Sequence, residues 1–134
     1  MELIFTYIVT LITFLAMDYV GLSFFVRPIF ERFVGNILLE QIRIFPALAF
    51  YSIFVFGVVW FVSAPALENG TGLRFVLPTA AFLGFLAYGT YEFTNLSTLR
   101  GWNWSMVIVD LAWGCFLTGT AATVGVALTR LVMG

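Results

Sequence analysis

Long apolar runs separated by short polar segments make up almost the whole chain. Four of the runs are long enough to cross a bilayer, which takes about 20 residues of helix. They cover residues 3–25, 44–63, 75–99 and 105–128, and the short segments between them favour antiparallel neighbours. The pattern predicts an all-α integral membrane protein, an antiparallel four-transmembrane-helix bundle that forms a single domain over residues 1–134.

The polar segments predict where the spans end. Pro28 and the charges around it end the first span, and residues 27–43 then alternate apolar and charged side chains in a way that predicts a short interfacial helix. Pro65 closes the second span, and residues 68–72 form a turn. Residues 100–104 read as a hairpin with tryptophans at the membrane interface.

Composition supports the membrane class and removes several functions. The chain is 62% hydrophobic and 10% charged, whereas a soluble domain carries roughly 25% charged residues. It has one cysteine and no histidine, so neither an intrachain disulfide nor a Cys/His zinc site is expected. A net charge of −1 without a basic arm gives no indication of a nucleic-acid partner. We expect no cofactor, no metal, and the lipid bilayer as the main partner.

One stripe of polar residues interrupts the third span. Gly84, Tyr88, Tyr91, Glu92 and Asn95 are spaced so that they share one face of a helix. A carboxyl, an amide and two phenols are costly to expose to lipid. We therefore expect this face to point toward the other helices or a cavity.

Other polar residues fall at the same depth. Asp18 lies late in the first span, Tyr51 early in the second and Asp110 early in the fourth, so alternating helix directions bring them to one half of the membrane. The predicted ligand-binding residues are Asp18, Tyr51, Tyr88, Tyr91, Glu92, Asn95, Asp110 and Trp113.

Three carboxyl groups at one level cannot all be ionised in a low dielectric without partners. Either protonated carboxyls and phenols form a network, or Arg27 and Arg100 reach in from the interface as counter-ions. Interhelical hydrogen bonding without any ligand is the structural alternative.

Two further features concern assembly and orientation. Small residues along the fourth span form a close-packing face that could serve inside the bundle or in a homodimer: Gly114, Thr118, Ala121, Ala122 and Gly125. The loops after spans one and three carry four arginines against two on the other side, which favours a cytoplasmic position for these loops.

Several stretches resemble a known family. They include residues 14–21, Arg27 with Pro28, Phe50 with Tyr51, residues 87–102 (AYGTYEFTNLSTLRGW) and residues 109–114 (VDLAWG). Over nearly the whole chain the sequence is similar to a bacterial family of predicted membrane proteins, the domain-of-unknown-function 2177 family. The resemblance implies four helices in the bacterial inner membrane and implies no activity. The chain departs from the family's pattern at Val20, where Trp is more common, and at Glu92, where Asp is frequent.

Three functions remain open at this point. The polar residues favour a protein that binds or transports a small ligand, a cation or a lipid. The aromatic content and short loops also suit an accessory subunit of a larger membrane complex. A lipid or isoprenoid acid–base enzyme would have to work with Asp18, Glu92, Asp110 and tyrosines alone, so the sequence favours a role without catalysis.

Overall fold

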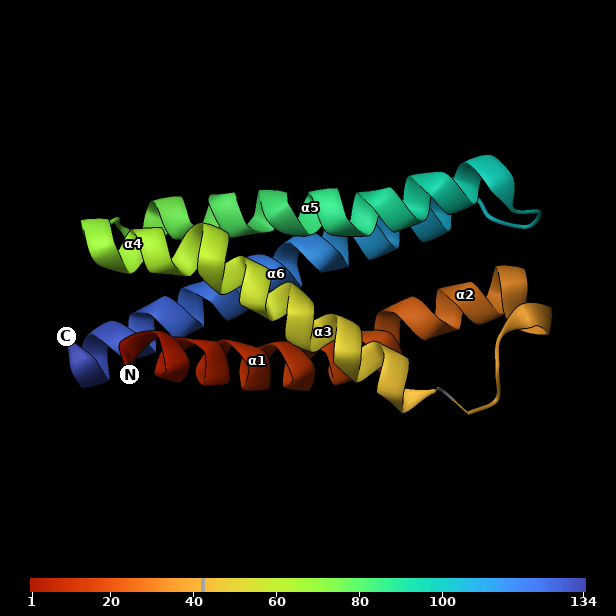
Figure 1. The fold of residues 1–134 in the computed structure, drawn as a ribbon. Helices are drawn as coiled ribbons and strands as arrows, with labels where there is room; N and C mark the ends of the chain where they lie inside the picture. The colour runs from red at the N-terminus through yellow and green to blue at the C-terminus, as the bar shows by residue number, and fades with distance from the viewer. Residues whose placement is uncertain (42) are drawn as a thin grey trace.

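The computed structural model describes residues 1–41 and 43–134, and in this part of the chain all regular structure is helical. Four segments are long and apolar enough to cross a membrane: Glu2–Ile37, Ile44–Asn69, Leu73–Thr98 and Trp104–Met133. Both termini and α4 (Ala64–Asn69) lie at one end of the molecule, and α2 (Arg27–Val34) lies at the other (Figure 1). The predicted four-helix membrane fold is confirmed.

The first segment continues beyond the predicted end of its span. α1 (Glu2–Gly21) leads into a widened π turn, η1 (Leu22–Val26), which leads directly into α2 and a last 3-10 turn, η2 (Gly35–Ile37). Pro28 is the second residue of α2 and has no N–H to donate to the turn before it. The π turn directly precedes this proline, so the chain bends there and remains helical. The short helix expected after the first span is present, although no loop separates it from α1.

The second segment also contains a π turn followed by a helix with proline at its second position. α3 (Ile44–Val58) passes through a second π turn, η3 (Val59–Ser63), into α4, whose second residue is Pro65. The prediction that Pro65 closes this helix was wrong, because the preceding π turn accommodates the missing donor. The helix ends instead at Gly70, whose φ of 65° lies in the left-handed region that glycine adopts without strain.

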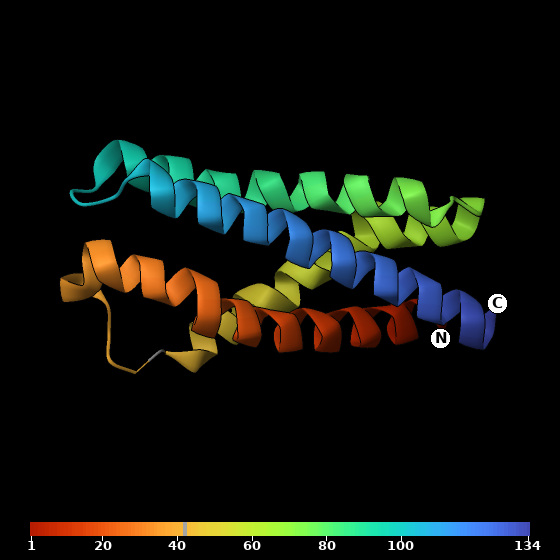
Figure 2. The same ribbon diagram turned by 180° about the vertical axis from the view of Figure 1, so that it is seen from behind.

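The third and fourth segments form the closest pair in the bundle. α5 (Leu73–Thr98) and α6 (Trp104–Met133) pack together, and the C-terminal part of α6 leads away from α5 toward the start of α1 (Figures 1 and 2). A Cβ added to Gly84 would lie 2.6 Å from the Gly114 carbonyl oxygen, so glycine permits this approach. The Asn103 side chain begins α6 by accepting from the N–H groups of Ser105 and Met106, at 3.0 and 3.4 Å.

α6 is the central helix. Half of its apolar span is buried, whereas the other three segments bury between 17% and 22% of theirs. It packs against α5 on one side and α1 on the other. The five small residues expected to form a close-packing face are all buried within this single chain: Gly114, Thr118, Ala121, Ala122 and Gly125. The face is therefore used inside the bundle.

The core is divided into three apolar clusters along the bundle. One lies at the α4 end around Val62, Val76 and Ala122, and one lies centrally around Phe14, Val55 and Leu117. The third joins α2 to the start of α6 through Phe30, Trp102 and Met106. The candidate site is placed between the second and third clusters, because its lining includes Phe30 from the third and Tyr51, Tyr88 and Trp113, which pack on the second.

Candidate intramembrane binding site

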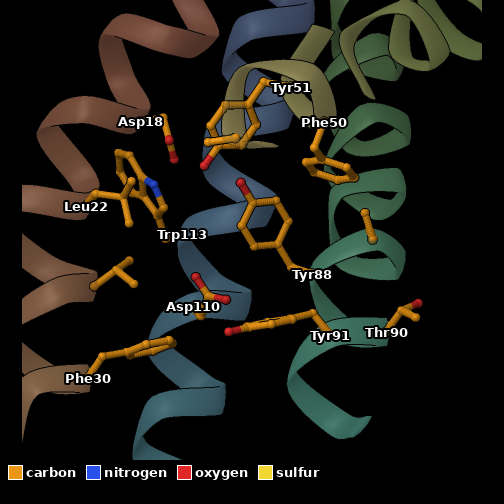
Figure 3. Close-up of a pocket in the computed structure, with 13 residues that line it drawn as sticks. Asp18, Leu22, Phe30, Phe50, Tyr51, Tyr88, Thr90, Tyr91, Asp110 and Trp113 are labelled. Atoms are coloured by element: carbon orange, nitrogen blue, oxygen red, sulfur yellow. The ribbon is translucent and has the colours of Figure 1, made fainter. Parts of the chain in front are cut away.

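A cavity of about 500 Å³ lies among all four helical segments. α1, η1 and α2 form one wall, α3 and α5 form the opposite one, and α6 lies behind them (Figure 3). Most of the lining is apolar, and a few polar groups converge on it. This combination of volume and lining is typical of small-molecule sites, which usually measure roughly 300–1,000 Å³.

Six of the eight residues predicted to bind a ligand line this cavity. They come from four separate helices and are Asp18, Tyr51, Tyr88, Tyr91, Asp110 and Trp113. Glu92 and Asn95 are absent from the lining. Depth in the membrane therefore predicted which helices contribute polar side chains. Which of these side chains line the cavity depends on the face of the helix on which each lies.

One group of polar side chains surrounds Asp18. The Asp18 side chain is 5% exposed and lies beside the Tyr51 hydroxyl and the Trp113 indole. The Tyr88 hydroxyl points toward the Tyr51 hydroxyl across the same space (Figure 3). The ring of Tyr51 is fixed from behind by Phe14, with ring centroids 5.4 Å apart. The two phenols therefore present hydroxyl groups to a common point next to a carboxyl group.

A second group lies nearer to α2. Asp110 is 7% exposed, and the Tyr91 hydroxyl points toward it (Figure 3). Tyr91 itself is 52% exposed, so it stands at the edge of the cavity. Phe30 closes this end from α2.

Neither proposed counter-ion reaches these carboxyl groups. The Arg27 Nε donates to Glu31 at 2.6 Å, one turn along its own helix. Arg100 is exposed in the connection between α5 and α6. Within residues 1–41 and 43–134, no ion pair involves Asp18, Glu92 or Asp110.

Glu92 has a different environment from the other acids. Its side chain is fully buried, and one carboxyl oxygen accepts a hydrogen bond of 2.9 Å from the Trp102 indole N–H. Its second oxygen receives no N–H or O–H from the described residues, and the Asp110 carboxyl lies within hydrogen-bond reach of Glu92. Asn95 lies one turn further along α5, beside Tyr91. The polar stripe of α5 therefore has two parts. Tyr91 lies at the edge of the cavity, and the Glu92 carboxyl is buried behind it.

Trp102, one of the two tryptophans of the predicted hairpin, is buried inside the bundle. It is 9% exposed and lies edge-on to Phe30 and Tyr91, with ring centroids 5.1 and 5.8 Å apart. Trp104, two residues later, is 61% exposed as an interfacial residue would be. The connection between α5 and α6 turns Trp102 inward, where it supports both Glu92 and the edge of the cavity.

The indole N–H of Trp113 lies in an unusual environment. The indole nitrogen is buried beside the Asp18 carboxyl without completing a hydrogen bond of good geometry, and the ring lines the cavity. A buried donor left without an acceptor costs about 1–3 kcal/mol. A Cβ added to Gly21 would overlap the indole ring, so α1 holds the ring closely in place. The cavity therefore has a fixed donor beside the acceptor oxygens of Asp18.

Sequence reasoning missed the apolar wall of the site. Seven residues complete the lining: Leu22, Val26, Phe30, Ala47, Phe50, Ala87 and Thr90. Six of them are apolar and so do not stand out in this chain, and the Thr90 hydroxyl donates to the Leu86 carbonyl of its own helix. Leu22 and Val26 reach the cavity from the π turn.

The donor set gives no indication of a metal centre. No group of three or more acidic or cysteine side chains that could hold a metal ion occurs within the ranges 1–41 and 43–134.

Four membrane-spanning helical segments around a partly polar cavity define a multi-span membrane protein. The chain belongs to the family described as predicted membrane protein (DUF2177), whose model matches residues 3–127. No curated protein and no solved structure matches the chain. The family establishes the membrane class and assigns no molecular function.

Proposed function

We propose that this protein binds a small amphiphilic molecule with a hydroxyl-bearing head inside the bundle. The observation that carries the proposal is the cavity in which Asp18, Asp110, three tyrosines and the Trp113 indole converge. Polar side chains within membrane spans are costly and commonly mark ligand or ion pathways.

The arrangement of donors and acceptors favours a hydroxyl group. Asp18 offers acceptor oxygens, and the neighbouring Trp113 N–H lies beside them without a well-aligned hydrogen bond of its own. A hydroxyl group can donate to the carboxyl and accept from the indole at the same time. The Tyr51 and Tyr88 hydroxyls adjust to either role, because each can donate or accept.

The apolar lining favours an amphiphile over a free ion. Phe50, Ala87 and Ala47 form the wall on the α3 and α5 side, and Phe50 is half exposed at the outer surface. A hydrocarbon chain fits against this wall and continues toward the surrounding lipid. We place the protein in the bacterial inner membrane, and binding of this kind could serve transport or lipid handling.

Native mass spectrometry after gentle extraction from the source membrane tests the proposal. We expect the native protein to carry one small molecule in a 1:1 ratio, with a mass that differs from those of the bulk lipids. Ala47→Trp fills the cavity wall without removing a polar group, so this variant should lose the molecule. The matched control is Leu48→Trp, since the neighbouring Leu48 is exposed and does not line the cavity.

Polar variants test how the head is recognised. Asp18→Leu should weaken retention by about fivefold, as expected for the loss of one hydrogen bond worth roughly 1 kcal/mol. Glu68→Gln, on the exposed end of α4, should retain the molecule fully. A wild-type protein that carries only bulk lipid would reject the proposal and leave interhelical hydrogen bonding as the role of these residues.

A further inference from the structure

A second cavity lies on the outer side of the first helical segment. Its volume is about 500 Å³, and it is lined by the end of α1, η1, α2, residues 37–39 and Arg43. Leu22, Val26 and Phe30 line both cavities, so this part of the helix is the wall between them. The chemistry of the two sides differs, because the first cavity contains carboxyls and the second contains guanidinium groups.

Two arginines from different elements line the second cavity. Arg27 belongs to α2, and Arg43 directly precedes α3. Among the described residues that line it there is no carboxylate. Arg32, the third arginine of this region, is instead placed over the Phe33 ring at 5.3 Å. The cavity therefore carries two guanidinium groups, and of these Arg27 also pairs with Glu31.

The Arg27 side chain is held in position. Its Nε donates to Glu31 at 2.6 Å, and its Nη2 donates to the Leu39 carbonyl at 3.3 Å. These contacts fix the guanidinium plane while it still lines the cavity. A fixed guanidinium loses less conformational entropy on binding an oxyanion than a free one does.

The polarity of this cavity changes along its length. Tyr19 and Leu22, at the α1 side, contribute apolar surface, and Ser23 adds a hydroxyl before the arginines are reached. The apolar side faces the part of the span that lies within lipid. The arginines lie at the end of the span, where headgroups are found. This gradient matches a lipid, with acyl chains along η1 and a phosphate at the guanidinium groups.

We propose that this second cavity binds the phosphate headgroup of an anionic membrane lipid. Inorganic phosphate shares the same chemistry, but it would gain nothing from the apolar surface of Tyr19 and Leu22. The site is separate from the first cavity and stands or falls independently of the function proposed for that cavity.

The experiment is a titration of the detergent-solubilised full chain, followed by native mass spectrometry. The probes are phosphatidylglycerol, diacylglycerol with the same acyl chains, and inorganic phosphate. Phosphatidylglycerol should bind with one strong site, and diacylglycerol should bind at least tenfold more weakly. Inorganic phosphate at equal concentration should not compete.

Two arginine variants test the assignment to the site. Arg43→Gln should weaken phosphatidylglycerol binding about fivefold, as expected for one arginine at a membrane surface. Combining it with Arg27→Gln should weaken binding more than tenfold. Arg74→Gln is the matched control, because Arg74 is placed over the Phe75 ring and does not line this cavity.

Three outcomes would overturn the proposal. Equal binding of phosphatidylglycerol and diacylglycerol would remove the role of phosphate. Unchanged binding in the double arginine variant would place the lipid elsewhere. Full competition by inorganic phosphate would make the site one for a soluble anion. Helical content measured by circular dichroism identifies any variant that fails to fold, and Arg43→Gln alone, at an exposed position, then carries the test.

Discussion

At the scale of single residues, the most consequential contact is the one between Trp102 and Glu92. The indole N–H supplies the hydrogen bond that the described structure provides to a fully buried carboxyl group. Trp102→Phe keeps the aromatic packing but removes this donor. We expect the free energy of unfolding to fall by about 1–3 kcal/mol, because a buried carboxyl oxygen then loses its donor. Denaturation in mixed micelles followed by circular dichroism measures the change.

Two comparisons separate this hydrogen bond from general packing. Trp104→Phe removes an indole N–H from an exposed side chain and should change stability by less than about 0.5 kcal/mol. In a Glu92→Leu background, Trp102→Phe should cost much less than in the wild type. Equal costs in the two backgrounds would show that the hydrogen bond contributes little.

Residues also show where the sequence is informative about the site. Asp18, Tyr51, Tyr88 and Asp110 could be assigned to one place because polar groups in apolar helices point inward. Trp102 could not, since its inward turn depends on the φ of 82° at Gly101 and on the approach of Phe30 from a distant element. Phe30 and Leu22 look like any other apolar residue until the helices are packed.

At the scale of helical elements, glycine decides how closely α5 and α6 approach. A Cβ at Gly114 would overlap the Tyr88 ring, which lines the cavity. We expect Gly114→Ala to lower the free energy of unfolding by about 1–3 kcal/mol, the usual cost of overpacking. It should also displace the Tyr88 hydroxyl and reduce ligand retention in native mass spectrometry.

Gly57 on α3 provides the control for this substitution. A Cβ at Gly57 would meet no other atom within 4 Å, so Gly57→Ala should not destabilise the protein. Equal loss of stability in both variants would indicate a general intolerance of alanine. Loss confined to Gly114→Ala would support close packing at the cavity.

Helix boundaries were harder to predict than helix existence. Apolar runs identified all four spans, because a helix of about 20 apolar residues matches the thickness of the hydrocarbon core. Pro28 and Pro65 were read as ends, yet each follows a π turn and lies inside a continuing helix. A sequence pattern with period 3.6 contains no sign of a π turn, so the extension of both segments follows only from the structure.

Arg130 ties two elements together at the opposite end of the bundle. Its Nη2 donates to the carbonyl oxygens of Ala66 and Thr71, at 3.0 and 2.6 Å, and so connects α6 to the end of α4. Arg130→Gln should lower the free energy of unfolding by about 1.5–3 kcal/mol, as for hydrogen bonds from a charged donor. The exposed Arg74→Gln should have a much smaller effect, and equal effects would reject a specific role for Arg130.

At the scale of the whole molecule, four spans require both termini to lie on one side of the membrane. The α4–α5 turn should share that side, and the connections around residues 40 and 99 should lie opposite. Single cysteines placed in a Cys115→Ala background report the side through a membrane-impermeant maleimide. Glu40→Cys and Leu99→Cys should label together, as should Glu68→Cys and Met133→Cys.

The arginines predict which side is which. Arg27, Arg32, Arg43 and Arg100 border the connections at residues 40 and 99, whereas Arg74 and Arg130 border the other end. Retention of arginine-rich loops in the cytoplasm then predicts that intact cells label Glu68→Cys and Met133→Cys but protect the other pair. The reverse pattern would keep the four spans and invert the molecule, which would also place the second cavity in the outer leaflet. Labelling of one member from each pair would contradict the four-span topology itself.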